Sequence, residues 1–278
     1  MKTLRSKQIL AAALTVVSLA VAAPSSVPAE PTAVACATKP TVVLVHGAWA
    51  GTSSWNGETE RLQQEGYKVR AFANPLRGLI SDAAGLAAFL KTIDGPIVLV
   101  GHSYGGSVIT NAAAGNPNVE QLVYVDAAAP AVGESTGQLS GKTSALSGPP
   151  DTLYDQVSSP GAPSGDVLLY LKQPVFLQSF GPDLPKADAT TLWAGQRPAA
   201  MSAFTTPSKA AAWKTIPSWY VIGTADKIIT PESQQTMAQR ANAKILRVPG
   251  GSHLTLISHP EPVTDQILAA AHATCPET

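Results

Sequence analysis

The sequence predicts an α/β domain in which about six mostly parallel strands are flanked by helices and a cap segment is inserted between two strands. Residues 42–45 and 97–100 are short, wholly apolar runs rich in β-branched residues, which is typical of strands buried on both faces of a parallel sheet. Helix-like segments alternate with such runs over short links, which is the pattern of β-α-β units. The residues after about position 36 are enough for one such domain.

The first 35 residues have the features of a secretory signal peptide followed by a Pro/Ala-rich leader. Lys2, Arg5 and Lys7 precede an apolar run over residues 9–23 that is too short to span a bilayer comfortably. Several Ala-x-Ala patterns follow, so the sequence leaves the cleavage position open. We expect a secreted protein, extracellular or periplasmic. We expect no membrane attachment after signal cleavage, because no later segment is long and apolar enough to span a bilayer.

Charge and cysteine content narrow the class of protein further. The 19 Lys and Arg residues balance the 19 Asp and Glu residues and form no basic cluster, so we expect no nucleic-acid partner. In an oxidising compartment the two cysteines, Cys36 and Cys275, predict a disulfide between the ends of the mature chain. The alternative, a lipoprotein cleavage box over Ala33–Cys36, is disfavoured because this stretch lies far beyond the apolar run.

Strands and helices alternate over the first half of the domain. The first strand, over 41–45, ends in a loop of mainly small residues over 46–49, and Gly66 ends the helix that follows. We then expect a helix over 54–66, a strand over 67–73, a helix over 79–93, a strand over 97–100 and a strand over 120–126. No internal repeat is evident.

The stretch Gly101-His102-Ser103-Tyr104-Gly105 connects the strand over 97–100 to a helix that ends near Gly115. It fills the pattern G-x-S-x-G, in which a sharp turn strains the central residue, needs small neighbours and leaves the serine hydroxyl exposed above the sheet. The helix start directs free N–H groups to the same point, so the N–H of Tyr104 is a candidate oxyanion donor. The alternative is that Ser103 is only a small residue in a tight turn.

The alternation stops between about residues 127 and 212, where we expect an inserted cap over the C-terminal edge of the sheet. Ligands bind at this edge in such folds, and the segment is too long for a plain loop. Helix-like pieces are expected over 166–172, 175–180 and 187–194. Candidates to line a pocket are Leu168, Leu169, Tyr170, Phe176, Phe180, Trp193 and Phe204. Any single one of them is more simply explained as part of the cap's own core.

The sheet resumes with strands expected over 218–223 and 244–248, each followed by a helix, over 231–241 and 260–273. A serine hydroxyl is a weak nucleophile near neutral pH and needs a base. His253 lies after the last strand in a Gly-rich loop and is the expected base. His46 and His102 are better explained as structural hydrogen-bonding residues. His259 and His272 lie in or beside the last helix and are expected at the surface.

Two aspartates each follow a strand and are candidates for the acid that orients the base. Both stand between Ser103 and His253 in the chain, which is the expected order. Asp226 is favoured because it follows the penultimate strand, the usual position for the acid. Asp126 remains the alternative acid, and for either aspartate a cap or turn role is the non-catalytic explanation.

The second oxyanion donor is expected in the loop that follows the first strand. This loop reads His46-Gly47-Ala48-Trp49, and the N–H of Ala48 is the candidate. Three residues are expected to border the pocket: Trp49 beside this donor, Leu254 beside the base, and Trp193 in the cap.

Six motifs carry a resemblance to a known family. They are V-L-V-H-G-A-W (43–49), G-H-S-Y-G-G (101–106), Y-V-D-A-A-A-P (124–130), G-Q-R-P (195–198), G-T-A-D-K-I-I (223–229) and G-S-H-L (251–254). Together they resemble the α/β-hydrolase superfamily, and more narrowly its branch of small-molecule esterases, plant methylesterases and hydroxynitrile lyases. The resemblance implies Ser103, His253 and Asp226 as a catalytic triad, with the N–H groups of Ala48 and Tyr104 as oxyanion donors.

Departures from relatives narrow the chemistry that the resemblance implies. Hydroxynitrile lyases of this branch carry a lysine directly after the catalytic histidine, where this chain has Leu254, so cyanohydrin cleavage is disfavoured. Haloalkane dehalogenases and epoxide hydrolases use an aspartate nucleophile, where this chain has Ser103.

We therefore expect a secreted serine carboxylesterase that hydrolyses small to medium neutral esters through an acyl-enzyme. This chemistry needs no metal ion and no organic cofactor. A lactonase or carbon–carbon hydrolase with the same triad is an alternative. An alternative from another class is a non-catalytic small-molecule-binding protein of the same fold.

Overall fold

The computed structural model of the chain describes residues 39–159 and 165–274, all within one unit, Ala35–Glu277. The predicted signal and leader over 1–35 and both cysteines, Cys36 and Cys275, lie outside the described residues, so export and the disulfide remain predictions. In the two described ranges, no helix combines the length and hydrophobicity that crossing a membrane requires.

A six-stranded sheet with the order β2-β1-β3-β4-β8-β9 forms the centre of the fold. Its strands are β1 Thr41–Val45, β2 Lys68–Phe72, β3 Ile97–His102, β4 Val119–Val125, β8 Ser218–Gly223 and β9 Lys244–Val248. All neighbouring strands are parallel, which confirms the predicted sheet. The order reverses between β1 and β3, and in such sheets ligands bind at the carboxyl ends of the strands beside this switch point.

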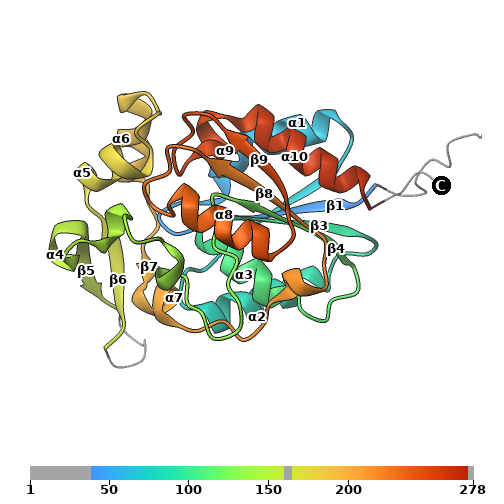
Figure 1. Cartoon of the computed structure of the whole chain (residues 1–278), viewed down its shortest axis with the longest axis horizontal. Coiled ribbons are helices and arrows are strands. Elements are labelled where there is room, and N and C mark those ends of the chain that lie inside the picture. The colour runs from blue at the N-terminus through green and yellow to red at the C-terminus, as the bar shows by residue number, and fades with distance from the viewer. Residues whose placement is uncertain (1–38, 160–164, 275–278) are drawn as a thin grey trace, which may run out of the picture. The chain divides into compact units, whose positions relative to one another are not determined.

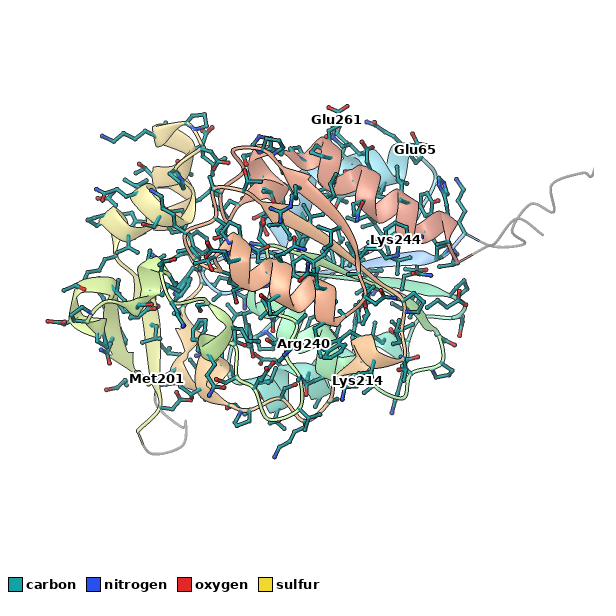
Figure 2. The ribbon with its side chains drawn as sticks, viewed as in Figure 1. Glu65, Met201, Lys214, Arg240, Lys244 and Glu261 are labelled. Carbon is teal, nitrogen blue, oxygen red and sulfur yellow. The ribbon has the colours of Figure 1, made fainter. Side chains whose placement is uncertain are left out.

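Helices cover both faces of the sheet. They are α1 Asn56–Gln64, α2 Leu79–Leu90, α3 Tyr104–Ala112, α8 Pro231–Arg240, α9 Thr255–Ser258 and α10 Pro260–His272. α1 packs against α10, and α2 packs against α3 on the opposite face (Figure 1). β1 and β3 are consequently buried at every position, as their apolar sequences require. Charged residues of the α1–α10 layer, such as Glu65 and Glu261, point away from the sheet (Figure 2).

The chain between β4 and β8 forms a second, antiparallel sheet with the order β5-β6-β7. Its strands are β5 Tyr154–Ser158, β6 Val167–Leu171 and β7 Ala199–Ala200. Around it lie the short helices α4 Pro150–Leu153, α5 Gln173–Val175, α6 Lys186–Ala194 and α7 Met201–Thr205, together with a π-helical turn over Phe176–Phe180. Single 3₁₀ turns are found at Thr52–Trp55, Gly137–Leu139, Ala145–Ser147 and Ala212–Lys214. We refer to residues 127–212 as the cap segment.

One predicted element of the cap segment is wrong. The helix expected over 166–172 is strand β6, which pairs with β5 along its whole length, from Tyr154 opposite Leu171 to Ser158 opposite Val167. Five consecutive apolar residues carry no periodicity that distinguishes a helix from a strand. The β5 partner decides the outcome, because it satisfies the backbone groups of an extended β6.

The cap segment meets the main sheet at the loops that follow β1 and β2. The indole N–H of Trp49 donates to the carbonyl of Leu169 at 2.8 Å, and the backbone N–H of Ala200 donates to Leu76 at 2.9 Å. Figure 1 shows the small sheet beside one end of the central sheet. The cap segment therefore lies against the carboxyl ends of the strands, next to the switch point.

Candidate active site

Ser103 occupies a strained turn between β3 and α3. Its backbone has φ 54° and ψ −125°, a conformation that non-glycine residues rarely adopt. Space for the turn depends on its glycines. A Cβ on Gly101 would lie 2.7 Å from the carbonyl oxygen of Gly105, and a Cβ on Gly105 would lie 2.5 Å from that of Val45. The glycines of the motif thus allow β3, α3 and β1 to approach closely while the serine keeps its strained position.

The structure brings Ser103, His253 and Asp226 into one hydrogen-bonded chain. His253 Nε2 lies 2.8 Å from Ser103 Oγ, and His253 Nδ1 lies 2.8 Å from Asp226 Oδ2. A carboxylate can only accept, so Nδ1 carries the ring proton and Nε2 accepts from the serine hydroxyl. All three residues are buried, with exposures of 6%, 0% and 3% in the order serine, histidine and aspartate.

The carboxylate of Asp226 is fixed by further donors from its own turn and from α8. Its Oδ1 accepts the backbone N–H groups of Ile228 and Ile229 at 2.7 and 3.1 Å. Its Oδ2 accepts the amide of Gln234 at 2.7 Å, in addition to His253. Sequence reasoning did not single out Gln234. Gln234 follows Asp226 by eight residues and lies in the first turns of α8. This spacing in the sequence could have indicated that its side chain reaches the Asp226 turn.

Asp126 is buried close to the same site but makes different contacts. Its carboxyl group accepts the N–H of Gly223 at 2.7 Å and the hydroxyl of Thr255, and it makes no hydrogen bond to His253 among the described residues. Burial and the nearby negative charge of Asp226 raise the pKa of Asp126 to about 7. Of the two candidate acids, the structure places Asp226 against the imidazole.

The two candidate oxyanion donors lie on either side of Ser103. Tyr104 is the first residue of α3, so its backbone N–H has no acceptor within the helix. Ala48 is fully buried in the loop after β1, and its N–H makes no hydrogen bond to another described residue. The neighbouring Gly47 lies directly against the serine, since a Cβ there would be 2.6 Å from Ser103 Cβ. Both N–H groups are therefore available beside the nucleophile.

His46 and His102 are buried, neutral and hydrogen-bonded to the backbone. The Nε2–H of His102 donates to the carbonyl of His253 at 2.8 Å. This bond joins the loop that carries His253 to the turn that carries Ser103, which we call the serine turn. Burial lowers the pKa of His102 well below its ordinary value. Burial, aided by the charge of Arg197 and opposed by a hydrogen bond to Gly47, lowers the pKa of His46 to about 4.

A cavity of about 430 Å³ lies between the cap segment and the loop after β1. Its lining consists of Trp49, Ala50, Gly51, Thr52, Ser53, Ser54, Phe176, Phe180, Thr191, Leu192, Gly195, Arg197, Leu254 and Ile257. We call it the cap cavity. Phe180 connects it to the site, because this side chain lines the cavity and also packs edge-on against the His253 ring, with centroids 5.0 Å apart.

The pocket candidates from the sequence fall into two groups. Trp49, Leu254, Phe176 and Phe180 line the cap cavity. The other candidates are not among the residues that line it: Leu168, Leu169, Tyr170, Trp193 and Phe204. The indole N–H of Trp193 instead donates to the carbonyl of Leu171, at the end of β6, at 2.9 Å. In the described ranges, no group of three or more His, Cys, Asp or Glu side chains is arranged to hold a metal ion.

The arrangement has the parts that acyl transfer needs. A hydroxyl on a strained turn is hydrogen-bonded to an imidazole, whose other nitrogen donates to a buried carboxylate. Such a chain allows the hydroxyl proton to leave as the oxygen attacks a carbonyl carbon. The free N–H groups beside it are suited to the negative charge that then develops.

Comparisons with known proteins identify a family model and two relatives that match much of the chain. The model of the alpha/beta hydrolase family matches residues 42–266. The alpha/beta hydrolase nvfD of Aspergillus novofumigatus is 29% identical over 84% of this chain and 97% of its own length. A carbendazim-hydrolysing esterase of a Nocardioides species is 31% identical over 59% of this chain and 71% of its own length.

Solved structures show the same fold. Polyneuridine aldehyde esterase superposes with a TM-score of 0.71 at 20% identity, covering 84% of this chain and 99% of its own. An extracellular alpha/beta-hydrolase of a Paenibacillus species gives 0.69 at 23% identity, covering 83% and 98%. A methylesterase from Arabidopsis gives 0.69 at 19% identity, covering 84% and 99%. At these identities the likeness establishes the fold alone.

Proposed function

The chain belongs to the alpha/beta hydrolase family, and we propose that it is a serine carboxylesterase in which Ser103, His253 and Asp226 form the catalytic triad. The observation that carries the proposal is the continuous hydrogen-bonded chain from Ser103 Oγ through both nitrogens of His253 to Asp226, 2.8 Å at each link. Esterases among the relatives support the hydrolytic class.

The proposed reaction begins with acylation of the serine. Ser103 Oγ attacks the ester carbonyl carbon while His253 Nε2 takes the hydroxyl proton. The carbonyl oxygen becomes negative and accepts the N–H groups of Ala48 and Tyr104. Asp226 keeps Nδ1–H in place and stabilises the imidazolium. The intermediate then collapses, the bond to the alcohol oxygen breaks, and the alcohol leaves with the proton from His253.

Hydrolysis of the acyl-enzyme repeats these steps with water as the nucleophile. His253 takes a proton from water as its oxygen bonds to the acyl carbon, and the second oxyanion uses the same N–H groups. When this intermediate collapses, Ser103 Oγ leaves with the proton from His253. The free enzyme is restored, and a carboxylic acid is the second product.

We propose small to medium neutral esters as substrates. All but one of the residues that line the cap cavity are uncharged, and its volume of about 430 Å³ suits a small molecule. Export as a secreted enzyme, a Cys36–Cys275 disulfide and a cap role for residues 127–212 belong to the same proposal.

The test is replacement of the proposed nucleophile with a matched serine control. Ser103→Ala is expected to abolish both ester hydrolysis and covalent labelling by a fluorophosphonate probe. Ser107→Ala removes another buried hydroxyl one turn along α3, one that bonds Thr136 instead, and should preserve both. Ester hydrolysis retained in Ser103→Ala would refute the proposal, and a wild-type protein that binds esters without labelling would be a binding protein.

Lactones and esters of graded acyl length, assayed with the same variants, distinguish carboxylesterase from lactonase activity. A lactone turned over much faster than any open-chain ester would replace the proposed substrate class and leave the triad in place. The mechanism alone does not discriminate, because the same triad serves both reactions.

A further inference from the structure

We propose that Arg197, in the G-Q-R-P turn of the cap segment, is a positioning residue that sets the direction of the oxyanion N–H of Ala48 by acting through His46. The inference rests on the proposed function of this loop. It gives the cap segment a part in the chemistry itself, in addition to covering the site.

Arg197 makes a hydrogen bond to each end of the loop His46–Trp49, which we call the oxyanion loop. Its guanidinium Nη1 donates to His46 Nε2 at 3.1 Å, at the start of the loop. Its backbone carbonyl accepts the N–H of Trp49 at 3.1 Å, at the end of the loop. Only Gly47 and Ala48 lie between these two contacts. The candidate oxyanion donor is therefore held from both sides by one residue.

The guanidinium decides which nitrogen of His46 carries the proton. Arginine is always charged and only donates, so His46 Nε2 must be an acceptor. In a neutral ring the proton then lies on Nδ1, which donates to the carbonyl of Gly47 at 2.9 Å. The lowered pKa of His46 agrees with a neutral ring. The carbonyl of His46 itself is held by the amide of Asn74 at 3.0 Å.

The peptide between Gly47 and Ala48 transmits this contact to the site. A peptide unit is planar and trans, so its N–H points opposite to its carbonyl. When His46 Nδ1–H binds the Gly47 carbonyl, the direction of the Ala48 N–H is fixed as well. Without the Arg197 contact, His46 can carry its proton on Nε2 instead of Nδ1. Nδ1 then has no hydrogen to donate to the carbonyl of Gly47. The peptide is then free to rotate, and the donor loses its alignment.

The loop has a strained backbone that needs such support. Trp49 has φ 57°, a left-handed conformation that a non-glycine residue keeps only where the surroundings enforce it. Its N–H is bound by Arg197 and its indole N–H by the carbonyl of Leu169. The ring stacks on Tyr154 and on Phe204, with centroids 5.8 and 5.3 Å apart. Every one of these partners belongs to the cap segment.

Gln196 anchors the turn that carries Arg197. Its side-chain oxygen accepts the N–H of Leu171 at 2.8 Å, and its side-chain amide donates to the carbonyl of the same residue at 3.0 Å. This double contact fixes the turn to the end of β6, the strand that also binds Trp49. In the G-Q-R-P motif, Gln196 thus binds the small antiparallel sheet, and Arg197 binds the oxyanion loop.

Among the described residues, no acidic group competes with His46 for the guanidinium of Arg197. In residues 39–159 and 165–274, no carboxylate forms an ion pair with this guanidinium. By contrast, Arg240, whose guanidinium also contacts the cap segment, is paired with Glu134 at 2.7 Å.

The test compares Arg197→Met with Arg197→Lys and with a matched arginine control outside the cap cavity. Arg197→Met keeps most of the bulk and removes the donors. We expect kcat to fall about tenfold with KM within about twofold, because a misaligned oxyanion donor weakens transition-state binding and leaves substrate binding intact. Affinity for a boronic acid, which mimics the tetrahedral intermediate, should fall by the same factor. Arg197→Lys retains a donor and should recover part of kcat.

The matched control is Arg247→Met, which removes another guanidinium, one that donates to the side-chain oxygen of Gln235 at 2.6 Å and does not line the cap cavity. It should change neither kcat nor KM. A double-mutant cycle tests the relay itself: His46→Ala should lower kcat as Arg197→Met does, and the combination should lower it no further.

Three outcomes would overturn the inference: unchanged kcat in Arg197→Met, a loss confined to KM, or additive effects of the two substitutions. If Arg197→Met unfolds, the Lys and His46 variants decide by the same criteria. The proposed function fails separately, when the wild-type protein neither hydrolyses esters nor reacts with a fluorophosphonate.

Discussion

Two buried aspartates near His253 differ in their partners. Asp226 accepts three N–H groups besides the imidazole, from Ile228, Ile229 and Gln234. Asp126 accepts one backbone N–H and one hydroxyl and has a raised pKa. The three N–H donors fix the Asp226 carboxylate in position against the imidazole, whereas the carboxyl group of Asp126 is held away from it by Gly223 and Thr255.

Replacing each aspartate by asparagine is expected to separate their roles. Asp226→Asn retains the shape but presents an amide to Nδ1, which favours the wrong histidine tautomer and should lower kcat by roughly 10³- to 10⁴-fold. Asp126→Asn should lower kcat by less than about tenfold, because its carboxyl group does not contact the imidazole. Steady-state kinetics with a chromogenic ester measure both, with circular dichroism as the check on folding. The reverse ranking would make Asp126 the acid.

At the scale of elements, two features affect packing: the glycines of the turn around Ser103 and a buried glutamate in α1. A Cβ on Gly105 would collide with the carbonyl of Val45, whereas a Cβ on Gly85 of α2 would make an ordinary contact, 3.7 Å from Phe72. In α1, Glu58 is fully buried, and its two carboxyl oxygens have no hydrogen-bond partner among the described residues.

The two glycine positions should respond to alanine in opposite directions. Gly105→Ala must push β1 and α3 apart and is expected to destabilise the protein by more than about 2 kcal/mol and to remove activity. Gly85→Ala gains helix propensity without a collision and should stabilise by roughly 0.5–1 kcal/mol. Chemical denaturation measures both. Equal effects of the two substitutions would show that the close approach of the serine turn does not limit packing.

Glu58 should make stability depend on pH. Burial raises the pKa of Glu58 well above its usual range. Between the ordinary and the raised value, the folded state holds a proton that the unfolded state has lost, so stability falls as pH rises through this range. Glu58→Gln should remove the decline, and Glu58→Leu should raise Tm at pH 8 by ending the burial of an unpaired polar group.

Thermal unfolding between pH 4 and pH 8 measures the effect of Glu58. Glu60→Gln, an exposed site on the same helix, is the control and should leave the wild-type profile unchanged. An identical pH profile in wild type and Glu58→Gln would contradict the account.

At the scale of the whole molecule, the site depends on contacts between distant parts of the chain. Ser103 and His253 are 150 residues apart, and they meet because parallel strands bring their carboxyl ends to one edge of the sheet. The cap segment is attached at its beginning as well. Arg240 of α8, labelled in Figure 2, binds both carboxylate oxygens of Glu134 and the carbonyl of Ala129. The candidate active site is therefore bordered both by the carboxyl edge of the sheet and by the cap segment.

The proposed Cys36–Cys275 disulfide would close nearly the whole mature chain into a loop. On the chain-entropy model such a bond stabilises by at most ~5 kcal/mol. A reducing agent should therefore lower the Tm of the protein. A Cys36→Ser/Cys275→Ser variant should match the reduced protein and show no response to reductant. Free thiols found in the unreduced wild type by mass spectrometry would exclude the bond.

Local sequence determined the main elements and the serine turn. Apolar β-branched runs specified the buried strands, because only a sheet covered on both faces accommodates them. Gly101 and Gly105 specified the sharp turn around Ser103, because no other residue fits there. Chain order and loop position placed His253 at the same edge of the sheet. These features depend on the backbone and on near neighbours, which the sequence contains directly.

Tertiary contacts decided the rest. The imidazole orientation that selects Asp226 over Asp126, the strand pairing that makes β6 extended, and the bond between Arg197 and His46 each join residues far apart in the chain. Local pattern left two aspartates as candidate acids, predicted a helix over 166–172 and assigned no individual role to Arg197. A buried polar group is nearly always hydrogen-bonded, so its partner is the donor or acceptor that the folded chain places next to it. That partner exists only once the chain has folded.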